Sequence, residues 1–147
     1  MRLEKIIHQD KILAIILGKD FVQEGIHFFT PDDFSQQLAY MKRPQGYVID
    51  PHVHNPIPRQ VEITQEVLFI KSGKLRVDFY DDVQVYLESR VLTAGDVILL
   101  AKGGHGFCML EECEIIEVKQ GPYAGEAEKT RFKSAAVSDI QIKERSG

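Results

Sequence analysis

The chain has 147 residues, 44% of them hydrophobic and 27% charged, and its formal net charge is −4. A chain of this length can bury a sizeable core, so we expect one domain over residues 1–147. The negative charge and the lack of a lysine- or arginine-rich block exclude a nucleic-acid footprint. No apolar run is long enough to cross a bilayer, and residues 1–10 do not resemble a signal sequence. We therefore expect a cytoplasmic protein without a membrane partner.

Short runs of apolar and β-branched residues, separated by turns, predict strands along most of the chain. In chain order these strands span residues 5–8, 12–17, 26–29, 36–41, 46–54, 61–70, 75–80, 83–92, 97–100, 107–110 and 113–119. Two prolines exclude a central strand at residues 55–59, which we expect to form a loop. Many short strands with almost no helix predict an all-β, antiparallel sandwich or barrel.

The domain divides into N-terminal strands over residues 1–35, a barrel-forming region over residues 36–120 and a polar tail over residues 126–147. The tail is expected either to pack on the outside or to be partly disordered. Apolar edge strands need cover, so residues 1–17 are predicted to pair with a second copy in a homodimer. The predicted core includes Leu68, Ile70, Val77, Ile98 and Leu100.

Two histidines in the predicted strand 46–54 point to a metal site. His52 and His54 are two residues apart, so their side chains leave the same face of an extended strand, about 6–7 Å apart. On its own, such a pair is equally consistent with a harmless surface position. Glu66 and His105 complete a candidate set. Glu66 shares its strand face with apolar residues, and an inward carboxylate needs an ion or a hydrogen-bond network.

These residues resemble the first motif of the cupin family. That motif is glycine, five residues, His-x-His, a short gap, glutamate, six residues and glycine. Here Gly46 is followed by five residues and then His52-Val53-His54, and Glu66 is followed by six residues and Gly73. The departure is the gap of 11 residues between His54 and Glu66, which is longer than the family's usual gap. Its two prolines allow it to bulge out as a loop.

The second cupin motif is matched less closely. Gly95-Asp96 opens it, but Ala101 replaces a proline and His105 arrives one residue early. The resemblance covers residues 36–120 and implies the cupin fold, an antiparallel double-stranded β-helix or jelly-roll barrel. Three stretches, around Glu66, around His105 and over residues 118–123, are similar to small single-domain cupins that accompany polysaccharide and nucleotide-sugar biosynthesis. This implies a substrate area but no reaction.

We predict that His52, His54, Glu66 and His105 bind one divalent transition metal, whose identity among Fe, Mn, Zn and Ni stays open. Three nitrogens and one oxygen leave coordination positions for a small-molecule ligand, which the context suggests is a sugar. The cysteines, Cys108 and Cys113, are expected to be free thiols, because cytosolic chains keep their cysteines reduced and this spacing matches no zinc signature.

Candidate substrate-binding residues lie in and beside the proline-rich insert. Arg59 has a planar fork that suits a carboxylate or phosphate, but it is equally consistent with a solvated loop arginine. Glu62 has the strand parity of Glu66, although a surface charge is the simpler interpretation. Tyr47 is a further candidate without a decisive signal. His8 and His27 are expected to be ordinary strand residues.

The leading hypothesis is a metal-dependent small-molecule enzyme, isomerase- or epimerase-like, that acts on a sugar or related polar metabolite. No catalytic residue is assigned. Three alternatives stay open: an Fe(II) dioxygenase-type cupin, a metal-free sugar isomerase whose histidines are acid–base groups, and a non-catalytic ligand-binding barrel.

Overall fold

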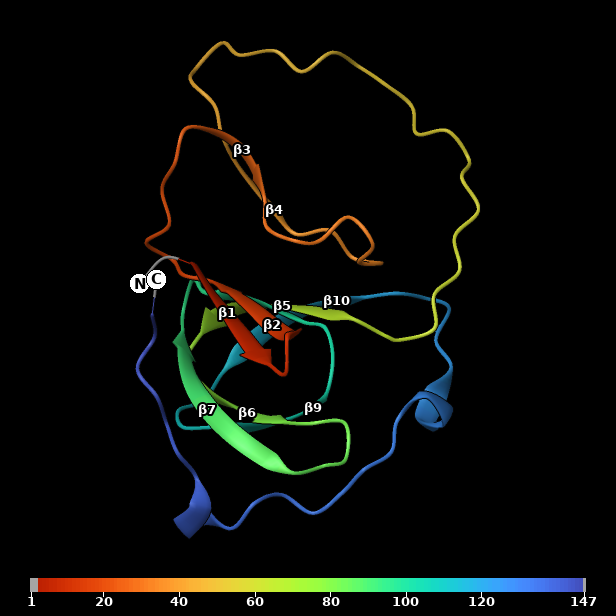
Figure 1. The fold of residues 1–147 in the computed structure, drawn as a ribbon. Coiled ribbons are helices and arrows are strands. Elements are labelled where there is room, and N and C mark those ends of the chain that lie inside the picture. The colour runs from red at the N-terminus through yellow and green to blue at the C-terminus, as the bar shows by residue number, and fades with distance from the viewer. Residues whose placement is uncertain (1–2, 147) are drawn as a thin grey trace.

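The computed structural model describes residues 3–146. Figure 1 shows a body of strands, a two-stranded hairpin beside it and a long arm that runs clear of both. The elements are β1 (Leu3–His8), β2 (Lys11–Leu17), β3 (Gly25–Phe28), β4 (Ala39–Lys42), β5 (Glu66–Ser72), β6 (Lys74–Tyr80), β7 (Tyr86–Thr93), β8 (Val97–Leu100), β9 (Gly104–Met109), β10 (Glu114–Lys119), and the short 3₁₀ helices η1 (Gly125–Glu128) and η2 (Val137–Asp139). No helix among these residues is long and apolar enough to cross a membrane.

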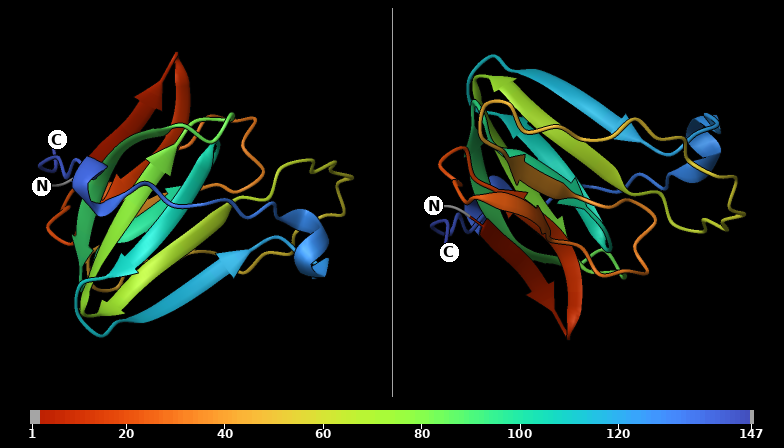
Figure 2. Two further views of the ribbon diagram at one scale, coloured as in Figure 1. Left: turned by 90° about the horizontal axis from the view of Figure 1, so that it is seen from below. Right: turned by 90° about the horizontal axis from the view of Figure 1, so that it is seen from above.

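The strands form antiparallel sheets, as the sequence predicts. A five-stranded sheet has the order β1-β2-β8-β5-β10, a three-stranded sheet has the order β7-β6-β9, and β3 pairs with β4. The two larger sheets are packed against each other (Figure 2). Each larger sheet ends in a strand that is paired on one side only among the described residues, β10 in one sheet and β9 in the other.

The core lies between these two sheets. Alternate residues of each strand point inward, because the side-chain period of a strand is two. Side chains from both sheets meet in one apolar cluster that joins β2, β5 and β8 to β6 and β7. All five predicted core residues are buried: Leu68, Ile70, Val77, Ile98 and Leu100. Burial of a side chain of this size stabilises the fold by roughly 1.5–3 kcal/mol.

The sheets do not close into a barrel in this structure, so the double-stranded β-helix implied by the resemblance stays a prediction. The reason lies in the stretch before β5. Residues 43–65, called the arm below, contain no strand or helix, so the strand predicted at 46–54 does not form, and the strand predicted from residue 61 begins only at Glu66. A strand needs a neighbour to satisfy its backbone, and the arm has none within its own chain. Pro51, Pro56 and Pro58 each remove a further ladder donor.

A tight turn between β5 and β6 explains the glycine that closes the first cupin-like motif. Gly73 has a φ of +91°, a conformation that costs residues with a side chain but not glycine. A Cβ atom there would also lie 2.1 Å from the backbone oxygen of Glu112. The turn therefore requires glycine on two counts.

In this structure the polar tail packs along the outside of the three-stranded sheet. Ser89 of β7 and Ile142 form a parallel bridge, with backbone hydrogen bonds from Ser89 to Gln141 and from Lys143 to Ser89. Farther back, the Ala135 N–H donates to the hydroxyl of Tyr80. The tail thus covers the outer edge of β7.

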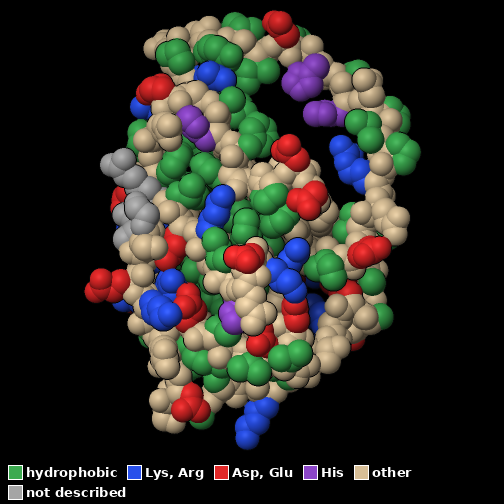
Figure 3. Space-filling model, in the orientation of Figure 1, with side chains coloured by type: hydrophobic (Ala, Val, Ile, Leu, Met, Phe, Trp, Pro, Cys, Tyr) green, Lys and Arg blue, Asp and Glu red, His purple; other side chains and the backbone are tan. Residues whose placement is uncertain are grey.

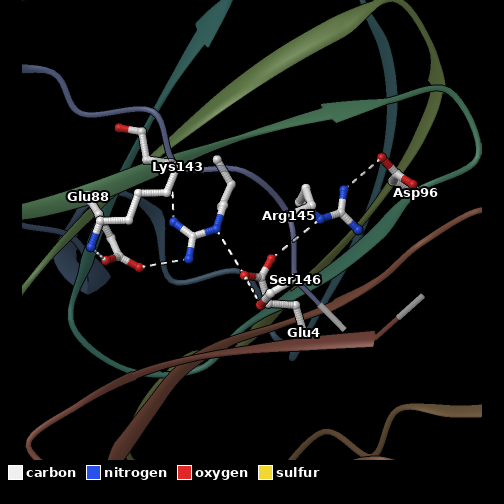
Figure 4. A network of polar contacts seen from close by, with 8 residues as sticks. Glu4, Glu88, Asp96, Lys143, Arg145 and Ser146 are labelled. Atoms are coloured by element: carbon white, nitrogen blue, oxygen red, sulfur yellow. Dashed lines mark hydrogen bonds and ion pairs between the residues drawn. The ribbon is translucent and has the colours of Figure 1, made fainter. Parts of the chain in front are cut away.

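A buried polar network holds both ends of the described chain together (Figure 4). Glu4 of β1 accepts a hydrogen bond from Arg90 of β7 at 3.1 Å and pairs with Arg145 at 3.5 Å. Arg145 also donates to Asp96 at 3.1 Å, and Ser146 donates to Glu4 at 2.8 Å. Glu4 is only 4% exposed, so its charge depends on these partners rather than on water.

We expect Arg145→Met to destabilise the protein by about 3 kcal/mol, because it leaves Asp96 and Glu4 short of a buried partner. Urea denaturation measures the loss. The matched control is Arg131→Met, which breaks the exposed ion pair to Glu126 and should change stability little. Equal effects of the two substitutions would show that the buried network does not hold the tail in place.

Cys108 and Cys113 are both unpaired in this structure. The free thiols expected from the sequence stay a prediction for the protein in solution. Replacing either cysteine by serine should change the free energy of unfolding by about 1 kcal/mol, which is what a modest packing change costs. If a reductant lowered the melting temperature of the wild type by many degrees, a disulfide would be present instead.

Candidate functional site

Glu66 begins β5 and points inward. The strand alternates, with Glu66, Leu68 and Ile70 buried and the residues between them more exposed. The parity argument from the sequence is confirmed here, since Glu66 is 8% exposed and lies on the core face. Glu66 is therefore the polar residue at one end of a line of inward-facing side chains, followed by Leu68 and Ile70.

His105 approaches Glu66 from the opposite sheet. It lies on β9 in register with Phe79 of β6, whose side chain is 1% exposed, and so it too faces inward. Its Nε2 atom is 3.7 Å from Oε2 of Glu66, slightly longer than a direct hydrogen bond. The chain reaches this position through Gly103, whose φ is +73° and where a Cβ would lie 2.4 Å from the backbone oxygen of Tyr80.

The histidine ring governs the charge of the acid. The His105 ring beside the carboxylate holds the pKa of Glu66 below its usual value of 4.5, although partial burial opposes the shift. Glu117 and Lys119 of β10 lower the same pKa further. Lys119 in turn lies 3.3 Å from Glu128 of η1. Glu66 is therefore a carboxylate at neutral pH, within a small cluster of titratable side chains.

These groups line a cavity of about 900 Å³ between the ends of the two sheets and the tail. One side carries Glu66, His105 and Glu117, and the tail supplies Arg131 and Phe132. The cavity is large enough for a small metabolite. Its charge is acidic, because four glutamates line it against one lysine and one arginine.

Aromatic side chains form the apolar part of the wall. The wall contains Tyr80 of β6 and Phe107 of β9 together with Phe132 of the tail. The rings of Tyr80 and Phe132 meet edge to face, with centroids 5.0 Å apart. The cavity therefore combines hydrogen-bond acceptors with flat apolar surfaces.

His52 and His54 lie elsewhere, on the exposed arm. Their ring centroids are 5.3 Å apart, and Nδ1 of His52 lies 2.9 Å from the backbone oxygen of Asp50. Figure 3 shows an opening between the arm and the body of the molecule. The structure thus places Glu66 next to His105 but does not bring the two arm histidines to them.

This placement shows whether the four predicted ligands are close enough together to bind one metal ion. Within residues 3–146, no three or more His, Cys, Asp or Glu side chains are grouped so that they could hold one ion. Two neighbouring ligands do not make the four-ligand centre expected from the sequence. In this conformation the residues do not fit the metal, and the predicted ligand set stays a prediction.

The three candidate substrate residues separate in the same way. Glu62 lines the cavity, at the end of the arm nearest β5. Tyr47 and Arg59 are exposed on the arm, away from the cavity, and the guanidinium of Arg43 covers the Tyr47 ring at 4.5 Å.

Sequence reasoning missed several residues of the cavity. Glu117 shares strand parity with Ile115, which packs on the core, so alternation along β10 was a usable signal. Glu128 ends the short helix η1, and Arg131 and Phe132 lie in irregular chain, so no periodic pattern indicates which of these side chains faces the body.

Comparisons with known proteins add no relative: no family model, no curated protein and no solved structure matches this chain. The resemblance to cupins accordingly rests on the motif residues alone.

The lowered pKa of Glu66 predicts a pH-dependent contribution to stability. A carboxyl whose folded pKa lies below its unfolded value of 4.5 stabilises the fold above that value and loses this contribution as the pH falls through the folded pKa. Wild type should therefore be more stable than Glu66→Gln at neutral pH, by less than about 1 kcal/mol after solvent screening. The difference should shrink and vanish as the pH falls through the folded pKa of Glu66. Denaturation curves at neutral and at acidic pH measure it, and a difference that grew in acid would contradict the assignment.

Proposed function

We propose that this chain is a cupin-like small-molecule enzyme that isomerises or epimerises a sugar or a related polar metabolite, with Glu66 and His105 as its acid–base pair. The observation that carries the proposal is the meeting of these two groups, 3.7 Å apart, in a cavity of about 900 Å³. A carboxylate and an imidazole at one point of a partly apolar cavity are suited to moving a proton.

The chemistry of the cavity favours a hydroxyl-rich ligand over a phosphorylated one. Its glutamates accept hydrogen bonds from hydroxyl groups, and their excess negative charge disfavours a phosphate. Two cationic groups line the cavity, Lys129 and Arg131, and Arg131 is paired with Glu126. The ring of Phe107, which lines the cavity and is 39% exposed, offers apolar surface to the C–H groups of a sugar.

The proposed step conserves atoms and electrons. One member of the pair removes a proton from the carbon next to a carbonyl, and the electron pair moves onto the carbonyl oxygen to give an enediol-type intermediate. The proton then returns to the neighbouring carbon, or to the opposite face of the same carbon, and the carbonyl reforms. Glu66 is the base that is charged at neutral pH, and His105 exchanges the proton that the oxygen gains and loses.

Solvent-proton exchange tests this step directly. A panel of neutral aldoses and ketoses in D₂O should gain deuterium at the carbon next to the carbonyl when wild-type protein is present. Glu66→Gln and His105→Ala should each slow exchange by about 10²–10⁴-fold, the usual contribution of a general acid or base. His27→Ala is the matched control, because its ring contacts the backbone oxygen of Glu24 on an exposed surface. Exchange that survives in both site variants would refute the acid–base pair.

A second candidate, metal-dependent chemistry, is favoured by the two arm histidines. Their rings already lie 5.3 Å apart, and the far end of the arm, at Glu62, Ile63 and Thr64, lines the cavity. Together with Glu66 and His105, these histidines would supply three nitrogens and one oxygen to an ion. A divalent ion held there would act as a Lewis acid on the carbonyl or as an Fe(II) oxygenase centre. A barrel that only binds its ligand would use the same residues.

Metal analysis separates these candidates. Protein purified without chelator or affinity tag should contain about one transition-metal ion per chain if the arm histidines are ligands. In that case His52→Ala should lose most of the ion, whereas His27→Ala should keep it. Metal-free wild-type protein that still catalyses exchange would favour the acid–base pair alone, and full metal content in all four ligand variants would refute the predicted set.

A further inference from the structure

The free edge of β9 is the least protected part of this fold. Four strands lie at the edges of the two larger sheets: β1, β10, β7 and β9. The tail covers β7 through the bridge between Ser89 and Ile142. The other edges differ in charge, since β1 and β10 carry lysine or glutamate side chains, whereas β9 (Gly104–Met109) contains no lysine, arginine, aspartate or glutamate. Charged residues are what usually keep an edge from pairing with another strand.

The inner face of β9 is also uncovered. Phe107 and Met109 lie opposite Val77 and Leu75 of β6, and these two partners are fully buried. Phe107 is nevertheless 39% exposed and Met109 is 53% exposed. Side chains on a core face remain this exposed when the next strand of the sheet is missing. The edge of β9 therefore has both free backbone groups and an exposed apolar face with which another strand could pair.

The arm has the complementary properties. Four aliphatic side chains on it are more than half exposed: Val48, Ile49, Val53 and Ile57. The backbone of residues 48–64 forms no hydrogen bond with the rest of the described chain. In an extended strand, residues 48, 50, 52 and 54 would direct their N–H and C=O groups to one side, and Pro51 would lie on the other. The missing N–H of Pro51 is therefore no obstacle to pairing along the even-numbered side.

Charge does not oppose the pairing. The arm carries two arginines against Asp50 and Glu62, so its formal net charge is zero with its two histidines neutral. β9 itself carries no lysine, arginine, aspartate or glutamate. No like charges are therefore brought together when the arm lies along β9.

We propose that the arm of one chain adds as a strand to the free edge of β9 in a second copy, so that two chains exchange their arms. The start of the arm is fixed in its own chain, because β4 pairs with β3 and the neighbouring Phe29 packs with Ile15 and Leu17. From there the arm runs clear of its own body before it returns to β5 (Figure 1). Reciprocal exchange covers both β9 edges and both arms at once, and such swapping is a low-cost route to a symmetric dimer.

The exchange has a consequence for the site. With the even-numbered residues paired, His52 and His54 lie on one face of the added strand, and Val53 lies on the other. If the histidines share the inner face with His105, the cavity of each copy is completed by the partner's arm. This consequence rests on the proposed function, but the exchange itself does not.

Disulfide trapping between two distinguishable chains tests the exchange. Cys108 lies on the outer face of β9, opposite Arg76, and Val53 would lie on the outer face of the added strand. The first chain carries Val53→Cys, and both of its native cysteines are replaced by serine. The second chain keeps Cys108 as its single cysteine and carries a tag, so that the two chains differ in length. Ile49→Cys, on the same face, covers a different register. After co-refolding and oxidation, a disulfide-linked heterodimer should form in the mixture and not in either chain alone.

The controls fix what each result means. Val83→Cys, which is 76% exposed on the β6–β7 turn, replaces the arm cysteine and should trap at least tenfold less heterodimer. Val48→Cys, on the inner face, should also trap less.

A chain that carries both Cys108 and Val53→Cys and forms only an internal disulfide at monomer mass would show that each arm folds back on its own β9, which overturns the proposal. The proposal is also overturned if Val53→Cys and Ile49→Cys each trap no more heterodimer than Val83→Cys does. Trapping does not depend on catalysis, so failed deuterium exchange with successful trapping would count against the proposed function alone.

Discussion

The packing of two antiparallel sheets through their inward rows is the constraint on which the rest of this structure depends. Each row is apolar along most of its length: Leu68 and Ile70 on β5 face Val77 and Phe79 on β6. Glu66 extends the first row by one inward position, and His105 of β9 extends the opposite sheet in register with Phe79. The site thus lies where the apolar layer between the sheets ends. Glu66 and His105 face inward there because they occupy inward-facing positions of β5 and β9, so the packing of the core fixes their placement.

The tail converts that open end into a cavity. Phe132 packs on Tyr80, and the next anchor, the Ala135 N–H, donates to the hydroxyl of the same tyrosine. Farther along, Arg145 inserts between Glu4 and Asp96, which are both almost completely buried. Breaking one member of such a group leaves charge without a partner, so the end of the chain is held more firmly than its polar composition indicates. The chain that supplies one wall of the cavity is therefore anchored by contacts to Glu4 of β1 and to Asp96 between β7 and β8.

How much the sequence predicts depends on whether a segment carries its own periodic pattern. Residues 75–80 alternate cleanly, and the observed strand β6 covers Lys74–Tyr80. The inward position of Glu66 follows from the same rule. The rule fails at residues 46–54, because parity states which way side chains point in a strand but not whether a partner exists to make the strand. It also fails at Arg131 and Phe132, which lie in irregular chain without any period.

The arm shows this limit most clearly, because its sequence has the composition of a strand and its surroundings do not provide one. Val48, Ile49 and Val53 are β-branched residues of the kind that favour a pleated surface, yet this propensity is realised only when a neighbouring strand offers packing and hydrogen bonds. β9 offers both and carries no charge to repel a partner. The predicted pairing of residues 1–17 with a second copy would use β1, where Lys5 is exposed and Glu4 is committed to Arg90. Of the two edges, β1 and β9, we expect β9 to bury more apolar surface on association, because Phe107 and Met109 are exposed there. It is also the edge that borders the site.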